Sequence, residues 1–491
     1  MKLSQLAGEA LAYALELTGD CDIRSLSADS REKTEQGLFF CIKGARHDAH
    51  FFAEQAVNNG AAALVVTQLQ PQLRVPQLLV SDDRAAMALM VRAYYGFADR
   101  GMKLVGITGT KGKTTTSYLV KAILEQSGYR CGLIGTTGNM IGSQWMNSNL
   151  TTPDPIDLHK TLRGMADAGC EYVVMEVSAH ALKMRRLEGL CFEAGCFTNL
   201  SQDHLDFFGT MEDYYQTKRS FFIEGFVKNA VISMDDQWAF RLAGEISIPK
   251  ISYAICTNAD LFARDIQIRE DGVSFLLSLW NDKYYPVSLK LMGMFNIYNA
   301  LAATGIGLTL GADPEIICKA LQSVASVPGR AEVLDTHTDY KVIVDYSHSP
   351  DALENILSAI REFIKGRLIV VFGCGGDRDQ GKRPMMGEIA GRMADLSILT
   401  SDNPRSEDPA SILASIEEGI KPTGGSYRVI ENRREAIRYA LDLAGENDVV
   451  LLAGKGHETY QEIAGIKRPF NEKQIVMQLL AEMGNKGEND A

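Results

Sequence analysis

Residues 103–126 constrain the fold of this chain more than any other segment. An apolar run at 103–107 leads into a stretch rich in glycine, threonine and lysine, and a helical pattern follows from 115 to 126. A buried strand that passes through a glycine loop into a helix opens an α/β unit. The backbone N–H groups of such a loop can surround phosphate oxygens. The segment therefore predicts an α/β fold with a nucleotide site.

The glycine loop carries the residue types that bind a nucleotide phosphate chain and its metal ion. Lys113 would reach the β- and γ-phosphates, and the Thr114 hydroxyl would face Mg²⁺. The strict phosphate-loop pattern has glycine where this chain has Ile107, so the loop is a variant, and an ordinary glycine-rich turn is the alternative. The residues expected to contact the nucleotide here are Gly109, Thr110, Lys111, Gly112, Lys113, Thr114 and Thr115.

Two further clusters are candidates for magnesium binding. Glu176 ends an apolar strand at 172–175, where a carboxylate can bind Mg²⁺ directly or through water. Asp203, His204 and Asp206 gather three ionisable side chains after a second strand. Taken singly, a solvated glutamate and a structural histidine remain the alternatives.

A second α/β series begins after residues 327–330, where proline and glycine mark a hinge. Uninterrupted apolar runs, which are typical of a parallel sheet covered on both faces, occur at 342–344, 368–372, 396–399 and 449–452. A polar cluster follows each run, at 345–348, 373–378, 401–405 and 454–458. Ligands of open α/β sheets bind at the carboxyl ends of the strands, so these clusters predict one crevice.

The composition narrows the class of protein. A length of 491 residues suggests two to four domains at about 100–200 residues each. The 50 Lys and Arg against 62 Asp and Glu argue against a nucleic-acid coat, which needs a basic surface. Neither a secretory signal nor an apolar run of about 18 residues is present. The nine scattered cysteines suit reduced thiols. We therefore expect a cytoplasmic protein with no membrane span and no nucleic-acid partner.

The ordered motifs resemble the ATP-dependent Mur ligases of bacterial cell-wall synthesis, and most closely the type that adds a diamino acid to UDP-N-acetylmuramoyl-L-alanyl-D-glutamate. The resemblance covers nearly the whole chain. It rests on the glycine loop and on the motifs at 29–31, 151–153, 176–180, 197–200, 203–206, 328–330, 345–353, 373–379, 402–405 and 454–458.

The resemblance implies an α/β fold of three domains and a defined reaction. Residues 1–97 would bind the UDP end, residues 98–329 would form a phosphate-loop-like ATPase domain with a parallel sheet, and residues 330–491 would form a Rossmann-like domain for the amino acid. The D-glutamyl carboxylate would attack the γ-phosphate of ATP, and the amine of the amino acid would displace phosphate from the acyl phosphate. We expect the chain to act as a monomer.

The resemblance also assigns roles around the nucleotide. Lys113, His204 and Lys218 would be catalytic, and Thr114, Glu176, His204 and a carbamylated Lys218 would hold Mg²⁺. A carbamate turns a cation into an anion; without the resemblance, Lys218 would be taken for a surface lysine. Further ATP contacts are implied for Asn296, Asn299, Arg330, Asp345 and His348, whose alternatives are a helix-surface asparagine or a surface ion pair.

On the side of the UDP-sugar-peptide, the resemblance implies a second set of contacts. These residues are Ala28, Ser30, Ala45, Arg46, His47, Thr151, Thr152, Ser178 and Arg186. The chain departs from the family pattern at Leu150, Met184 and Phe208, where the family often has Asn, Gln and His. These changes remove polar contacts near the peptide, but they leave the class of reaction unchanged.

The amino-acid site is implied at Arg378, Asp402, Asn403, Pro404, Arg405, Gly454 and Glu458. In the family this form goes with meso-diaminopimelate, whose second carboxylate matches the planar fork of Arg405. Glu458 could pair with the distal ammonium. The alternatives are the same reaction with L-lysine or lanthionine, a paralogue outside cell-wall synthesis, and a non-catalytic scaffold. A nicotinamide oxidoreductase, suggested by residues 373–376, lacks the dinucleotide fingerprint.

Overall fold

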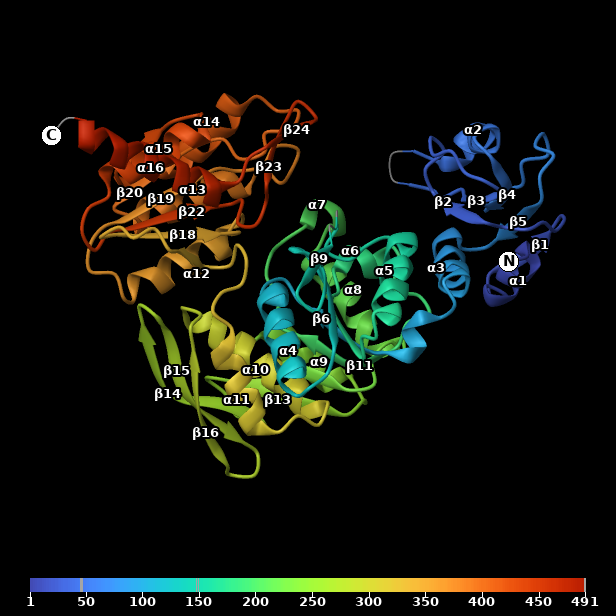
Figure 1. Ribbon diagram of the computed structural model, residues 1–491, viewed down its shortest axis with the longest axis horizontal. Coiled ribbons are helices and arrows are strands. Elements are labelled where there is room, and N and C mark those ends of the chain that lie inside the picture. Colours follow the sequence, from blue (N-terminus) through green and yellow to red (C-terminus); the bar gives the residue numbers. More distant parts are fainter. Residues whose placement is uncertain (45–46, 147, 149, 490–491) are drawn as a thin grey trace.

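The computed structural model describes residues 1–44, 47–146, 148 and 150–489, with backbone only for 484–489. Three large sheets organise the described chain. They are five-, eleven- and six-stranded, and a two-stranded hairpin accompanies the last. Figure 1 shows the eleven-stranded sheet and its helices in the middle, with the other two units on opposite sides of it. No helix among the described residues is long and apolar enough to cross a membrane.

The first sheet has the strand order β1-β5-β4-β3-β2. Its strands are parallel except for β1, which runs antiparallel to β5. Helices α1 and α3 contribute apolar side chains to one core against it, and α2 to another. The bounds are α1 Leu3–Glu9, β1 Ala14–Leu17, β2 Ser25–Ser27, β3 Gly37–Phe40, α2 Ala53–Asn58, β4 Ala61–Val66, β5 Gln77–Val80 and α3 Asp83–Tyr94.

The eleven-stranded sheet has a parallel centre and antiparallel ends. Its order is β16-β15-β14-β13-β12-β11-β6-β10-β7-β8-β9, and the strands from β14 to β7 run parallel. The bounds are β6 Lys103–Thr108, β7 Cys131–Gly135, β8 Gly138–Ile141, β9 Gln144–Met146, β10 Tyr172–Glu176, β11 Phe192–Phe197, β12 Ala230–Ser233, β13 Lys250–Ala254, β14 Leu261–Arg269, β15 Gly272–Leu279 and β16 Tyr284–Leu289.

Two buried layers of apolar side chains cover the faces of this sheet. Helices α4, α10 and α11 contribute to one layer, and α5, α6, α8 and α9 to the other. The central strand β6 leads directly into the loop before α4, so the glycine loop lies at the middle of the sheet. The bounds are α4 Lys113–Gln126, α5 Pro155–Asp167, α6 Ala179–Lys183, α7 Leu205–Phe208, α8 Met211–Ile223, α9 Gln237–Glu245, α10 Met294–Thr309 and α11 Pro314–Ser323.

The third sheet has the order β17-β18-β22-β19-β20-β21 and is parallel except at β17. Its central strands are buried on both faces, as the apolar runs predict. The bounds are β17 Glu332–Leu334, β18 Lys341–Asp345, α12 Pro350–Arg361, β19 Leu368–Phe372, α13 Lys382–Met393, β20 Leu396–Leu399, α14 Pro409–Ile420, β21 Tyr427–Val429, α15 Arg433–Leu443, β22 Val449–Ala453, β23 Tyr460–Ile463, β24 Ile466–Pro469 and α16 Glu472–Asn489.

Candidate functional site

The glycine loop needs both of its glycines because neighbouring side chains lie against its backbone. Gly109 has a φ of 141° and Gly112 a φ of 84°, in the region that favours glycine. A Cβ on Gly109 would lie 1.9 Å from the Thr198 hydroxyl, and one on Gly112 would lie 2.4 Å from Oδ1 of Asn299. The loop is therefore a tight, defined structure in which few other residues would fit.

Two lysines meet at the carbonyl of Gly109. Nζ of Lys113 donates to Gly109 O at 2.9 Å and to Thr110 O at 2.8 Å, and Nζ of Lys218 donates to Gly109 O at 2.8 Å. Burial lowers the pKa of Lys113, and burial together with the charge of Lys113 lowers the pKa of Lys218 well below 10.5. The sequence alone made Lys218 a surface lysine, and that interpretation is wrong, since its side chain is 1% exposed. Its amine therefore favours the neutral form.

Glu176 connects the loop to the next strand. Its Oε2 accepts from the Thr114 hydroxyl at 3.1 Å and from the Thr136 hydroxyl at 3.0 Å, and its Oε1 accepts from Thr136 N–H at 2.9 Å. The glutamate is fully buried, so it is not a solvated strand end. Sequence reasoning missed Thr136, whose only signal is a polar pair directly after the apolar strand β7.

The six-stranded unit supplies groups to the same loop. Nη2 of Arg330 donates to the Thr114 hydroxyl at 3.0 Å, and its guanidinium lies 4.7 Å from the ring centre of Tyr346. Nζ of Lys111 lies 3.2 Å from the Asp351 carboxylate at the start of α12. The loop after β6 is therefore in contact with residues from both sides of the hinge.

Asp345 and His348 lie close to this contact. Asp345 accepts from the N–H groups of Ala331 at 2.7 Å and Ser347 at 2.8 Å, and from the Ser347 hydroxyl. Both carboxylate oxygens are thus engaged in holding the hinge backbone. Burial and the charge of Lys382 lower the pKa of His348, and its Nδ1 lies 2.8 Å from the carbonyl of Tyr346.

Asn296 and Asn299 lie one turn apart on α10 and are buried. Nδ2 of Asn299 donates to Oδ1 of Asn296 at 2.9 Å, while Oδ1 of Asn299 lies against Gly112 and 3.4 Å from the Thr116 hydroxyl. The alternative of helix-surface asparagines is therefore wrong. Asn299 instead connects α10 to the glycine loop, and Asn296 holds the Asn299 side chain.

His204 directly precedes α7 and has a φ of 55°. Its ring meets the ring of His180 edge-on at 4.9 Å, and His180 also packs against Phe207 and Phe208. Burial lowers the pKa of His204, the nearby Lys113 lowers it further, and Asp203 opposes this effect. Phe208, where the family often has His, contributes an apolar ring to this cluster.

No three His, Cys, Asp or Glu side chains converge on one point within the described ranges. A magnesium site here would therefore depend on the Thr114 hydroxyl and on a modified Lys218 in addition to Glu176 and His204. The hydroxyl and carboxylate oxygens are the hard donors that Mg²⁺ prefers. Their contact at 3.1 Å fits a shared ion, whereas the ammonium of Lys218 does not fit without modification.

The residues expected for the substrate peptide meet beside Glu176. The Thr152 hydroxyl donates to the carbonyl of Glu176 at 2.7 Å and accepts from Ser178 N–H at 3.0 Å. Nη1 of Arg186 donates to the carbonyl of Thr152 at 2.8 Å, and the Thr151 hydroxyl lies 3.0 Å from that of Thr136. These residues thus form a polar wall next to the nucleotide loop.

The residues expected for the UDP end belong to the five-stranded unit. Ala28 and Ser30 follow β2, and the Ser30 hydroxyl donates to Gln55 at 2.9 Å. His47 is exposed, and Ala45 and Arg46 lie outside the described residues. Leu150 is 42% exposed, and Met184 is the C-cap residue of α6. Both side chains are apolar, so neither supplies the polar contact that the family often has at its position.

The third group of residues follows β19, β20 and β22, as predicted for a crevice at the carboxyl ends. Arg405 has a φ of 52°, and its Nη1 donates to Gly376 O at 2.6 Å. A Cβ on Gly375 would lie 2.9 Å from that guanidinium, and one on Gly376 would lie 2.0 Å from Pro404 O. The glycines at 373–376 therefore serve close packing of two loops, which accounts for them without a dinucleotide.

A buried polar network supports this crevice. Nζ of Lys455, which is fully buried, donates to Oδ1 of Asn403 and to Oε2 of Glu458, both at 3.1 Å. The same Glu458 oxygen accepts from Nδ2 of Asn403 at 2.9 Å. Asp402 lies beneath Gly454, whose Cβ would come within 2.6 Å of Oδ2. Arg378 is exposed at the rim. Sequence reasoning assigned no role to Lys455.

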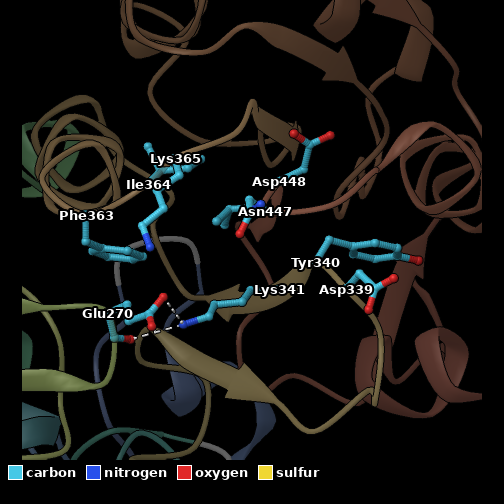
Figure 2. Close-up of a pocket in the computed structure, with 10 residues that line it drawn as sticks. Glu270, Asp339, Tyr340, Lys341, Phe363, Ile364, Lys365, Asn447 and Asp448 are labelled. Carbon is cyan, nitrogen blue, oxygen red and sulfur yellow. Dashed lines mark hydrogen bonds and ion pairs between the residues drawn. The ribbon is translucent and has the colours of Figure 1, made fainter.

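A separate cavity of about 60 Å³ lies at the opposite edge of the six-stranded sheet, where its strands begin. Figure 2 shows Lys341 in it, bonded to Glu270 from the β14–β15 turn. Lys341 and Val449 begin β18 and β22, so the cavity is at the amino ends of the strands. It is therefore distinct from the residues predicted to bind the amino acid, which follow the carboxyl ends of the strands.

Comparisons with known proteins agree with this geometry. Residues 107–307 match the Mur ligase middle domain, and residues 329–456 match the Mur ligase glutamate ligase domain. A UDP-N-acetylmuramoyl-L-alanyl-D-glutamate–2,6-diaminopimelate ligase of Clostridium acetobutylicum is 43% identical, over 98% of this chain and 100% of its own length. A ligase of the same name from Caldanaerobacter subterraneus subsp. tengcongensis is 46% identical over 94% and 95%.

Solved structures give the same result. A structure of a UDP-N-acetylmuramoyl-L-alanyl-D-glutamate–2,6-diaminopimelate ligase matches with a TM-score of 0.67 and 33% identity, over 94% of this chain and 95% of the other. The fold is also that of a MurF ligase from Thermotoga maritima in complex with ADP, with a TM-score of 0.62 and 20% identity over 95% and 99%. Sequence and structure together place this chain in the Mur ligase family.

Proposed function

We propose that this chain adds meso-diaminopimelate to UDP-N-acetylmuramoyl-L-alanyl-D-glutamate with hydrolysis of ATP to ADP and phosphate, a step of peptidoglycan precursor synthesis. The observation that carries the proposal is the position of Arg405, on the loop that follows β20, beside the loop that follows β19. A guanidinium there matches a second carboxylate in the acceptor amino acid. L-Lysine has no such group and would leave the half-buried cation poorly paired.

The groups around the glycine loop support the first half of the reaction. Lys113, Lys111 and Arg330 would bind the phosphate oxygens of ATP, and the N–H groups of the loop would add further donors. Transfer of a phosphoryl group needs positioning and positive charge more than covalent help from the protein. The D-glutamyl carboxylate attacks the γ-phosphorus, the bond to ADP breaks, and an acyl phosphate forms.

The second half needs an amine that is free of its proton. The α-amine of the amino acid attacks the acyl carbon, and phosphate leaves from the tetrahedral intermediate. Contact between the loop and the six-stranded unit, through Arg330 and Lys111, would bring the two substrates together. The same contact would exclude water, which would otherwise hydrolyse the acyl phosphate.

Magnesium would be held by Thr114, Glu176, His204 and a carbamylated Lys218. When bound, the ion neutralises the phosphates and the charge that develops during transfer. The protein prepares Lys218 for this role, because a buried amine with a lowered pKa is a nucleophile toward carbon dioxide. The resulting carbamate would replace the unfavourable ammonium beside Lys113 with an anion.

The remaining substrate contacts follow the three sheets. We propose domains at 1–97, 98–329 and 330–491, with the UDP end on the first. Thr151, Thr152, Ser178 and Arg186 would hold the peptide end. The nucleotide site would be completed by Asn296, Asn299, Asp345 and His348. We also propose that the enzyme acts as a monomer in the cytoplasm, where ATP is available. The amino-acid contacts are Arg378, Asp402, Asn403, Pro404, Arg405, Gly454 and Glu458.

A phosphate-release assay with each substrate omitted in turn tests the proposal. Release should require ATP, Mg²⁺, the UDP-sugar-dipeptide and meso-diaminopimelate together. Lys113→Ala should reduce it by about 10²–10³-fold, the usual effect of losing one group that stabilises the transition state. Lys160→Ala, on the exposed face of α5, is the matched control. Full activity of Lys113→Ala, or faster release with L-lysine than with diaminopimelate, would contradict the assignment.

A further inference from the structure

The turn that follows α6 has an arginine at the position where helices commonly end with glycine. Arg185 N–H donates to Leu182 O at 3.0 Å and Arg186 N–H donates to Ala181 O at 2.9 Å, which are the paired hydrogen bonds of a Schellman motif. Arg185 has a φ of 52°, in the left-handed region that glycine adopts with less strain. The strain at this position therefore calls for a compensating interaction of the arginine side chain.

The side chain of Arg185 extends to the five-stranded unit. Its Nη2 donates to the hydroxyl of Tyr13 at 2.7 Å, directly before β1, and its Nη1 lies 3.3 Å from Oδ2 of Asp82, directly before α3. Oε2 of Glu188, from the same turn as Arg185, accepts from Nε at 3.1 Å and from Nη2 at 3.0 Å. This set of contacts, the Arg185 bridge, joins two groups of the five-stranded unit to the central unit.

Asp82 links the Arg185 bridge to the segment after β3, where part of the UDP contacts are expected. Oδ1 of Asp82 caps α3 by accepting from the N–H groups of Arg84 at 3.1 Å and Ala85 at 2.9 Å. Nη2 of Arg84 donates to Lys43 O at 3.0 Å, and Lys43 N–H donates to Oδ2 of Asp83 at 2.8 Å. The start of α3 therefore holds the backbone of that segment.

The residue after Arg185 belongs to the peptide side of the site. Nη1 of Arg186 donates to Thr152 O at 2.8 Å, and its Nε lies 2.8 Å from Oδ1 of Asp154. The turn also lies directly against α3, since a Cβ on Gly189 would come within 2.7 Å of Leu89. Two consecutive arginines thus connect the two regions in which the ends of the UDP-sugar-peptide are expected to bind.

We propose that Arg185 is a positioning residue that sets the spacing between the UDP end and the peptide end of the substrate site. This inference rests on the proposed function and deepens it. Without the Arg185 bridge, the five-stranded unit could change its angle relative to the wall formed by Thr152 and Arg186. A substrate that both units bind would then lose affinity, whereas a ligand that the five-stranded unit binds alone would keep it.

Arg185→Gly separates the role of the side chain from that of the backbone. Glycine adopts the left-handed conformation readily, so the turn should still form while the Arg185 bridge is lost. The KM for UDP-N-acetylmuramoyl-L-alanyl-D-glutamate should rise by about 10-fold, the effect of losing a charge-assisted contact. The inhibition constant of UDP-N-acetylmuramate, which lacks the dipeptide, should stay unchanged, as should the KM values for ATP and meso-diaminopimelate.

Tyr13→Phe tests the Arg185 bridge from the other unit. It keeps the aromatic ring and removes the hydroxyl, so it should raise the same KM by about 2- to 10-fold. Combined with Arg185→Gly it should add less than its separate effect, because both substitutions remove one interaction. His337→Gly makes the same backbone change at a φ of 53° with a side chain that is 84% exposed, and this matched control should behave like the unmodified enzyme.

The outcomes separate positioning from a purely structural role. If Arg185 only completes the turn, glycine will leave the KM for the UDP-sugar-dipeptide unchanged. If it only supports the fold of the five-stranded unit, the UDP-sugar-dipeptide and UDP-N-acetylmuramate will weaken to the same extent. Either result overturns the inference and leaves the proposed function intact, as would fully additive effects of the two substitutions. Absence of turnover of the UDP-sugar-dipeptide by the unmodified enzyme would remove both.

Discussion

Two lysine amines share one loop carbonyl, and neither forms an ion pair with a carboxylate within the part of the chain that the structure describes. Lys218, which is buried, donates to Gly109 O, and the same carbonyl accepts from the half-buried Lys113. The folded state therefore favours neutral Lys218, whereas the unfolded chain binds a proton up to a pKa of 10.5. Because the unfolded state binds more protons, this lysine lowers stability as the pH falls below 10.5.

Lys218→Met should therefore stabilise the protein and inactivate it. In buffer free of carbon dioxide, we expect its free energy of unfolding to rise by about 1–3 kcal/mol at neutral pH, because an inadequately paired buried group is removed. The gain should shrink as the pH approaches 10.5. Denaturant titrations at the two pH values measure it. A less stable Lys218→Met at neutral pH would show that the lysine is well accommodated.

Arg405→Gln should separate acceptors that differ only in their distal group. Loss of a charge-assisted contact of about 1.5–3 kcal/mol raises a KM by about 10- to 100-fold. We expect that rise for meso-diaminopimelate, with kcat nearly unchanged, and no rise for L-lysine. Arg392→Gln, whose arginine is 68% exposed on α13, is the matched control. Equal losses for both amino acids would assign Arg405 a structural role.

At the scale of single residues, the sequence could predict the position of side chains whose place is set by a motif. Lys113, Thr114 and Glu176 lie where strand ends and a glycine loop place them. It could not predict Thr136 or Lys455, because Glu176 and Asn403, with which they form hydrogen bonds, come from other segments of the chain. It could also not predict how deeply Lys218 is buried, since a helix surface lysine and a buried one look alike in a single sequence.

At the scale of elements, helices α13 and α14 pack backbone to backbone. A Cβ on Gly387 would lie 2.1 Å from the carbonyl of Ile416, and one on Gly419 would lie 1.8 Å from the carbonyl of Pro384. The backbone of one helix cannot yield as a flexible side chain can. This close crossing places the loops that flank the two helices, including the one that carries Arg405.

Gly387→Ala should therefore destabilise the protein by about 1–3 kcal/mol, the usual cost of overpacking. Gly164 provides a sharp control, since it also lies within a helix but has nothing within 4 Å of its Cβ position. Gly164→Ala should gain about 0.5–1 kcal/mol from helix propensity. Thermal unfolding of both variants measures the contrast. Equal effects of the two substitutions would contradict the close packing.

The parallel strands were predictable because burial on both faces leaves uninterrupted apolar runs. The runs at 368–372 and 396–399 coincide with β19 and β20. The antiparallel strands β14–β16 and the hairpin β23–β24 were not predicted. Their residues alternate irregularly or are exposed throughout, so no period in the sequence marks them. Strands β14–β16 also place apolar side chains in the core, whereas the hairpin β23–β24 has no buried residue and relies on pairing with neighbouring segments.

Across the whole molecule, charge is distributed so that an acidic chain can bind anions. The net charge is −12, yet the proposed ligands are ATP, a UDP-sugar-peptide and a dicarboxylic amino acid. Cations lie at each of the proposed binding places: Lys113 and Arg330 at the glycine loop, Arg186 beside Thr152, and Arg405 on the loop after β20. Net charge thus excludes a nucleic-acid coat and says little about the site.

The residues proposed to hold the peptide, and the hinge, both adjoin the segment around Glu176 and the glycine loop. The polar wall of Thr152 and Arg186 lies beside Glu176, and the hinge residue Arg330 touches the glycine loop. A peptide carboxylate held at that wall would face the nucleotide on one side and the crevice on the other. The packing is therefore compatible with the reaction proposed above.

A competition experiment tests the central claim most directly. The enzyme is given UDP-N-acetylmuramoyl-L-alanyl-D-glutamate, ATP, Mg²⁺ and equal concentrations of meso-diaminopimelate and L-lysine, and the nucleotide-linked product is identified by mass spectrometry. We predict a product that carries diaminopimelate almost exclusively, formed together with one ADP and one phosphate. A product that carries mainly lysine, or release of phosphate without any new peptide bond, would contradict the account.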